Sequence, residues 1–161
     1  MSEAAVPTLP ANLLTLWPKL GPAFGVVRRW NGPRGIIFIT EDDQGIDAAR
    51  QVASVVGGKT VELAETGLKK DEFEKDVGRF LDRSVLDGEA RWMGMDRVCL
   101  IIPRIDRQPK WLPAKLKSYW DSYRRPFILL LTCPDIEAMP EDLKGHLYEC
   151  RKKGAAKASN D

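Results

Sequence analysis

The chain has 161 residues, of which 43% are hydrophobic and 30% are charged, a length that suits one globular domain with a sizeable core. Its 25 basic residues nearly balance its 23 acidic ones, and a formal net charge of +2 gives no global reason to expect nucleic acid or a membrane surface as a partner. No apolar run approaches the roughly 18 residues of a membrane-spanning helix.

The cysteines and the N-terminal residues indicate the compartment. Cys99, Cys133 and Cys150 are odd in number and are not closely spaced, which favours a reducing environment. The first residues have neither the basic patch nor the apolar stretch of a secretory signal. We therefore expect a cytoplasmic protein that has no membrane partner.

Proline and glycine are frequent near the N-terminus, which favours an extended segment over regular structure. At most one short helix is predicted there, over residues 11–17, with apolar side chains that dock on the domain. Trp17 is one of these docking side chains, and an exposed arm with Trp17 and Trp30 is the alternative, in which the arm serves as a contact surface. The predicted organisation is an arm, a single α/β domain and a flexible basic tail, over residues 1–34, 35–150 and 151–161.

The elements that follow the arm alternate between strands and helices. A continuous apolar run over residues 35–40 predicts a strand that is buried on both faces. A helix, a strand, a long helix, a strand, a helix, a strand and a last helix are then predicted over residues 43–56, 60–64, 69–86, 97–102, 112–123, 126–132 and 140–148. This order predicts a three-layer α/β sandwich with a mostly parallel sheet of at least four strands.

Ligands of such sheets bind beyond the carboxyl ends of the strands, which directs attention to the loop after the first strand. Glu41, Asp42 and Asp43 stand there at the start of a helix, with one glycine and no lysine in the loop. Carboxylates at a helix N-terminus repel a phosphate, so an ordinary nucleotide site is not expected. The three side chains could hold Mg²⁺, whose preferred ligands are oxygens, or they could cap the helix and face solvent.

A looser form of the phosphate-loop pattern occurs over residues 53–60, where two glycines precede Lys59 and Thr60. A working phosphate loop runs from a strand into the N-terminus of a helix. Here the pattern runs from the end of a helix into a strand. The glycines are therefore predicted to end the helix, and Lys59 is predicted to lie at the sheet edge opposite the ligand crevice.

Two family resemblances concern the same crevice. Residues 15–150 resemble the AAA+ ATPase domain of clamp-loader subunits in the spacing of the first and third apolar strands and in the strand that ends at Thr132. Thr132 matches the sensor position of that family. The acidic turn replaces the phosphate loop, and the strand over 97–102 ends in Pro103 and Arg104 without the acidic pair that binds Mg²⁺. The resemblance implies a member that has lost ATP hydrolysis and binds partners.

The second resemblance is to response-regulator receiver domains. The strand over 35–40 with its acidic cluster is similar to theirs, and Thr132 matches their hydroxyl position. Cys99 stands near the place of the phosphoacceptor aspartate, and no fifth strand with a lysine is predicted. This resemblance implies a phospho-switch that lacks its acceptor.

A local excess of positive charge lies over residues 97–125, with eight basic residues against two acidic ones. Basic groups contact phosphates, and an aromatic side chain such as Trp111 can stack on unpaired bases. An acidic protein partner would suit the same charges. The candidate contact residues are Arg104, Arg107, Lys110, Trp111, Lys115, Arg124 and Arg125.

The sequence therefore predicts a non-catalytic binding or adaptor subunit of a multi-protein assembly, linked to nucleic-acid processing. A protein partner is expected, nucleic acid is a second candidate partner, and no cofactor is expected. The alternative is a Mg²⁺-dependent enzyme or a receiver-like switch that uses Glu41, Asp42 and Asp43.

Overall fold

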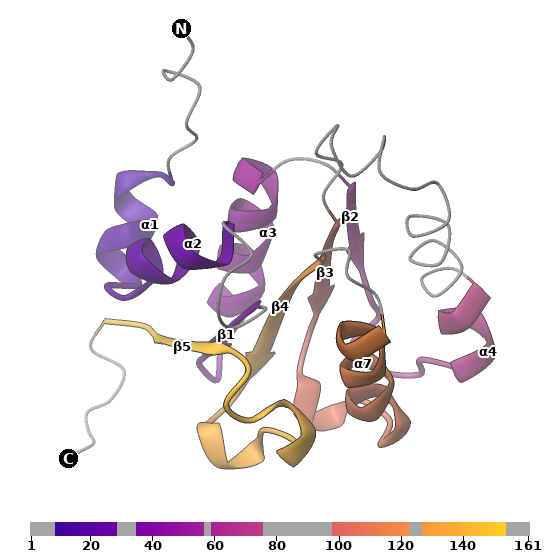
Figure 1. The fold of residues 1–161 in the computed structure, drawn as a ribbon. Coiled ribbons are helices and arrows are strands. Elements are labelled where there is room, and N and C mark those ends of the chain that lie inside the picture. The colour runs from indigo at the N-terminus through magenta and orange to yellow at the C-terminus, as the bar shows by residue number, and fades with distance from the viewer. Residues whose placement is uncertain (1–8, 29–34, 57–58, 76–97, 123–126, 154–161) are drawn as a thin grey trace, which may run out of the picture.

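The computed structural model describes residues 9–28, 35–56, 59–75, 98–122 and 127–153. Figure 1 shows its helices and strands. Short 3-10 helices are written η in the text. In chain order the elements are α1 (Ala11–Leu16), α2 (Leu20–Arg28), β1 (Gly35–Ile39), α3 (Gln44–Val56), β2 (Lys59–Glu62), α4 (Lys70–Phe73), β3 (Val98–Ile102), η3 (Ile105–Arg107), α7 (Trp111–Ser122), β4 (Phe127–Cys133), η4 (Ile136–Ala138), η5 (Glu141–Leu143) and β5 (Tyr148–Arg151).

The five strands form one sheet in the order β2-β3-β4-β1-β5, and all four pairings are parallel. β4 lies between β1 and β3, so that Leu131 is paired with Ile37 on one side and with Ile102 on the other. All of β1 is buried, as expected for a parallel strand that is covered on both faces. The structure confirms the predicted α/β sandwich.

Helices cover both faces of the sheet (Figure 1). Ile36 and Phe38 of β1 belong to a buried cluster that includes residues of α1, α2 and α3. Ile37 and Ile39 belong to a second cluster on the other face, which includes residues of α4, α7 and the 3-10 turns. Successive side chains of a strand point to opposite faces, so one apolar run supplies both layers of the core.

The segment predicted to be an arm contains two helices that belong to the core. The predicted short helix is present as α1, but α2 was not predicted, and Trp17 between them is completely buried, as docking requires and contrary to the exposed alternative. Pro22 lies in the first turn of α2, where amide groups have no partner within the helix, so a proline is tolerated there. Trp30 lies outside the described residues.

The predicted last helix over residues 140–148 is wrong. Pro140 is followed by a single 3-10 turn, η5, and Gly145 then adopts a left-handed conformation with φ of 82°. The chain continues as β5, which pairs with β1 at the edge of the sheet. β5 is only four residues long and buries Cys150 while Glu149 and Arg151 are exposed, so it lacks a continuous apolar run.

The other elements agree with their predicted positions. α4 covers only the start of the helix predicted over 69–86, and residues 76–86 lie outside the described part. α3 ends at Val56 and β2 begins at Lys59, so residues 53–60 run from a helix into a strand as predicted. No helix in the described ranges combines the length and the apolar character that crossing a membrane requires.

Candidate functional site

Two segments that are 110 residues apart meet at the carboxyl end of β1. The Asp42 carboxylate, in the turn before α3, accepts hydrogen bonds from the Thr40 hydroxyl at 3.0 Å and from the Gln44 amide at 2.9 Å. Lys152, directly after β5, donates to Asp42 at 2.5 Å and to the Gln44 side-chain oxygen at 2.6 Å. Asp42 therefore stabilises the start of α3 and anchors the end of β5.

This network sets the charge state of Asp42. The hydrogen bond from Lys152 holds the pKa of Asp42 below its usual value, and those from Gln44 and Thr40 act in the same direction against the opposing effect of partial burial. The Asp42 side chain is 49% exposed, whereas that of Lys152 is 20% exposed. The negative charge of Asp42 is therefore compensated by Lys152.

The stability of the fold should depend on pH through Asp42. Because its pKa is lower in the folded than in the unfolded chain, its contribution is present above the ordinary Asp pKa of about 3.9 and is lost as pH falls through the folded value. Urea unfolding should show wild type more stable than Asp42→Asn at neutral pH, with the difference vanishing in acid. In a Lys152→Gln background the Asp42→Asn effect should shrink, and an undiminished effect would contradict this pairing.

Thr132, the buried hydroxyl residue of β4, contacts the segments that follow β3 and β1. Its Oγ1 accepts a hydrogen bond from the backbone amide of Arg104 at 2.8 Å, after β3. A Cβ atom on Gly45 would lie 3.1 Å from the methyl groups of both Thr132 and Thr40. The first turn of α3 thus packs directly on the ends of β1 and β4.

In the loop after β3, the backbone of Arg104 adopts a left-handed conformation, with φ of 45° and ψ of 68°. Few residues other than glycine adopt it. The Arg104 guanidinium donates to both carboxylate oxygens of Asp106, at 2.9 and 2.7 Å, and this pair lowers the pKa of Asp106. A two-point contact of this kind fixes the planar guanidinium in one orientation. Arg104 is therefore turned onto its own loop.

Gln108 connects the loops after β2 and β3. Its buried amide nitrogen donates to the carbonyl oxygens of Pro103 at 2.8 Å, Ala64 at 3.0 Å and Glu65 at 3.3 Å. Its Oε1 is buried and has no hydrogen-bond partner within the part of the chain that the structure describes. Gln108 therefore holds together the two loops that follow β2 and β3.

The structure does not bring the predicted metal ligands into a metal site. Glu41, Asp42 and Asp43 are all exposed, and Asp42 is engaged by Lys152. Across the described ranges, no group of three or more His, Cys, Asp or Glu side chains is placed to hold a metal ion. For Asp42, therefore, the geometry agrees with the capping interpretation, and the Mg²⁺ interpretation has no geometric support.

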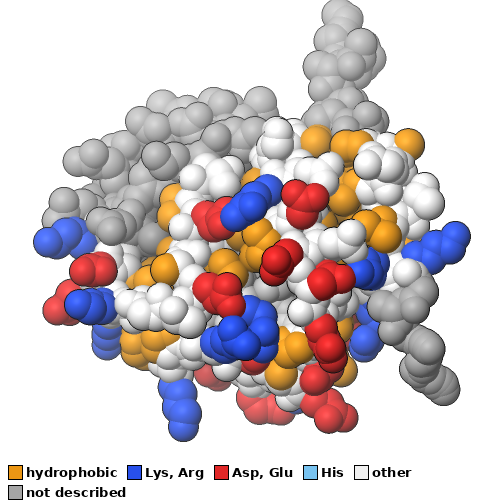
Figure 2. Space-filling view, turned by 180° about the vertical axis from the view of Figure 1, so that it is seen from behind, with side chains coloured by type: hydrophobic (Ala, Val, Ile, Leu, Met, Phe, Trp, Pro, Cys, Tyr) orange, Lys and Arg blue, Asp and Glu red, His pale blue; other side chains and the backbone are white. Residues whose placement is uncertain are grey.

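The predicted basic surface is largely compensated by acidic side chains. Arg104 pairs with Asp106, Arg107 pairs with Glu65 at 2.9 Å, and Lys115 pairs with Glu74 at 2.6 Å. The face drawn in Figure 2 likewise shows acidic and basic side chains interspersed. Of the remaining candidates, Lys110 is exposed, while Arg124 and Arg125 lie outside the described residues.

Trp111 is less available for stacking than the sequence suggested. It is half-buried at the start of α7, and its ring lies 5.5 Å from that of Phe73 in α4, tilted by 57°. Its packing against the apolar cluster explains its presence.

Two of the cysteines near the sheet ends are held as protonated thiols. Burial raises the pKa of Cys133 to about 11 and that of Cys150 to about 12. The Cys133 thiol also donates a hydrogen bond to the Asp135 carbonyl oxygen at 2.9 Å. A nucleophilic cysteine requires a thiolate, and a pKa this high leaves almost none at neutral pH. These raised pKa values therefore disfavour a nucleophilic role for either residue.

Sequence reasoning counted Lys152 only among the basic residues of the tail, missed its contact with Asp42, and gave Gln108 no role. Lys152 lies in the segment assigned to a flexible tail, and its proximity to Asp42 depends on the pairing of β5 with β1. Gln108 carries no sequence signal that separates it from an ordinary loop residue.

Comparison with known proteins assigns no relative: no protein-family model matches the chain, and no curated protein matches it.

Proposed function

We propose that this domain is a non-catalytic binding subunit, a AAA+-like core without nucleotide hydrolysis that works in an assembly that processes nucleic acid. The observation that carries the proposal is the network around Asp42. In a nucleotide site, the loop after β1 and the start of the next helix offer amides and a lysine to phosphates. Here the Gln44 amide and the Lys152 ammonium are both directed at the protein's own Asp42 carboxylate.

The order of the strands supports the AAA+ part of the proposal. Because β4 lies between β1 and β3, Thr132 is placed between the loops that follow those two strands. A residue at the sensor position needs this place in order to contact a nucleotide held between the loops. Thr132 instead accepts a hydrogen bond from Arg104.

One observation favours the receiver-like alternative. Contrary to the prediction, a fifth strand exists, and Lys152 after it pairs with Asp42 in the acidic turn. The strand order counts against this alternative, because flavodoxin-like receiver folds have the order 2-1-3-4-5, whereas β1 here lies between β4 and β5. The interior of β3 also offers only apolar side chains and Cys99, so no phosphoacceptor is present there.

Nucleotide binding tests the proposal directly. We expect calorimetric titration of the full chain with ATP and Mg²⁺ to detect no binding in the micromolar range and no hydrolysis. The reason is that Lys152 and Arg104, at the carboxyl end of the sheet, are already paired with Asp42 and Asp106. Micromolar affinity or turnover would refute the non-catalytic assignment. Titration with Mg²⁺ alone, followed through the amide resonances of residues 41–44, should leave them unchanged; saturable shifts there would favour the Mg²⁺-dependent alternative.

A further inference from the structure

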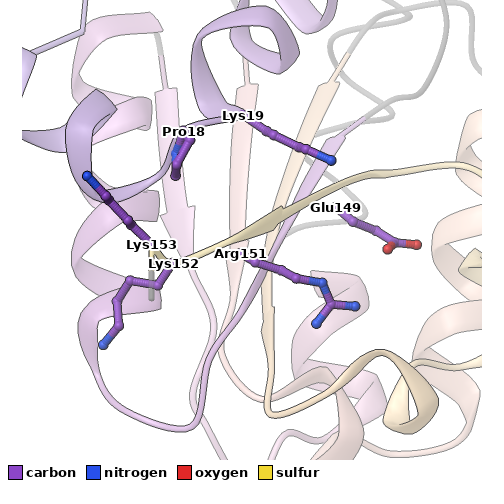
Figure 3. A pocket seen from close by; sticks show the side chains of 6 residues that line it. All are labelled: Pro18, Lys19, Glu149, Arg151, Lys152 and Lys153. Carbon is purple, nitrogen blue, oxygen red and sulfur yellow. The ribbon is translucent and has the colours of Figure 1, made fainter. Parts of the chain in front are cut away.

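A pocket of about 270 Å³ lies where β5 meets the turn between α1 and α2 (Figure 3). The backbone amide of Lys153 donates to the carbonyl oxygen of Leu16 at 2.6 Å, which fixes the end of β5 against the last residue of α1. The pocket is therefore built by two segments from opposite ends of the chain. Its lining residues are Pro18, Lys19, Glu149, Arg151, Lys152 and Lys153.

This pocket carries positive charge that the protein does not compensate. Lys152 is paired with Asp42, but in the described part of the chain Lys19, Arg151 and Lys153 form no ion pair. All three are exposed, and Glu149 is the one carboxylate in the lining. By contrast, the cations at Arg104, Arg107 and Lys115 each have an acidic partner. The pocket is thus the better site for an anionic ligand.

The arrangement of the cations suits an extended ligand. In Figure 3 the side chains of Lys19 and Arg151 extend toward the right of the view, and those of Lys152 and Lys153 extend toward the left. One phosphate group cannot contact side chains that diverge in this way, whereas a strand with successive phosphates can. No lining residue is aromatic, so binding would depend on phosphate contacts and would be insensitive to base sequence.

We propose that this basic pocket binds the phosphodiester backbone of nucleic acid. The proposal rests on the function proposed above and names the surface that makes the contact. Lys19, Arg151 and Lys153 supply the charge, and Lys152 lines the pocket while it ties this surface to the acidic turn through Asp42.

The triple variant Lys19→Gln/Arg151→Gln/Lys153→Gln tests the proposal in the full chain. Anisotropy of a labelled oligothymidylate of about 12 nucleotides should show an affinity loss of at least about tenfold near 50 mM salt. The slope of log affinity against log salt should fall in magnitude by about 2, because each phosphate contact on a single strand contributes about 0.7. Wild-type affinity and slope in this variant would overturn the proposal. Circular dichroism establishes that the variant is folded.

A matched variant, Lys69→Gln/Lys70→Gln/Lys144→Gln, removes the same charge from exposed positions elsewhere and should leave binding nearly unchanged. If it abolishes binding while the pocket variant does not, the pocket is excluded and the nucleic-acid role stands. If wild type binds no oligonucleotide, the nucleic-acid role fails as well. Inorganic phosphate and polyglutamate serve as competitors: either one binding the pocket more tightly than the oligonucleotide overturns the assignment to a nucleic-acid strand.

Discussion

Replacing Trp17 with alanine is expected to lower the free energy of unfolding by about 3–5 kcal/mol. The Trp17 side chain is completely buried, and its ring meets that of Phe38 edge-on at a centroid distance of 5.1 Å. Its loss would leave a cavity between β1 and the helices α1 and α2. Urea unfolding of the variant and of wild type measures the difference.

Trp17→Phe is the matched control for this prediction. The indole N–H of Trp17 is buried and has no hydrogen-bond partner among the residues that the structure describes. Phenylalanine therefore removes volume but no hydrogen bond, and keeps an aromatic ring against Phe38. We expect it to cost less than half as much as alanine. If Trp17→Ala costs under about 1 kcal/mol, the N-terminal helices do not belong to the folding unit.

The central strands could be predicted because their apolar sequences suit only a position that is buried on both faces of a sheet. β1 is apolar throughout, and β4 is apolar except for Thr132 near its end; an apolar run of this length fits a strand that is buried on both faces. β5 could not be found in this way. As an edge strand it alternates buried Cys150 with exposed Glu149 and Arg151, and Pro140 upstream imitates the start of a helix.

The candidate site was predicted in position but not in its contacts. The sequence placed Asp42 and Thr132 at the carboxyl edge of the sheet, because that edge follows from the strand assignments. Local sequence also indicated a basic surface around Arg104 and Arg107, but their acidic partners depend on how loops return to one another. Lys152 reaches Asp42 only because β5 pairs with β1. Since the sequence predicted a helix in place of β5, the contact between Lys152 and Asp42 could not be predicted.

The position of β1 between β4 and β5 can be tested at Gly35. Substitution of Gly35 by alanine is expected to lower the free energy of unfolding by about 3 kcal/mol. A Cβ atom there would overlap the Leu129 carbonyl oxygen and lie 2.8 Å from both the Leu129 Cβ and the Leu147 Cδ2. Leu129 belongs to β4, and Leu147 directly precedes β5. The position is crowded from both sides because β1 lies between these strands.

Gly21→Ala provides the matched control. A Cβ atom on Gly21, in α2, would lie 3.7 Å from Leu14 Cδ2, an ordinary contact, so alanine should be neutral or should stabilise the helix by roughly 0.5 kcal/mol. Thermal and urea unfolding of the two variants should therefore give opposite results. If Gly35→Ala is as stable as wild type, β1 is not enclosed by β4 and β5. The pairing of Lys152 with Asp42 and the basic pocket beside β5 would then lose their structural basis, because both require β5 at that edge.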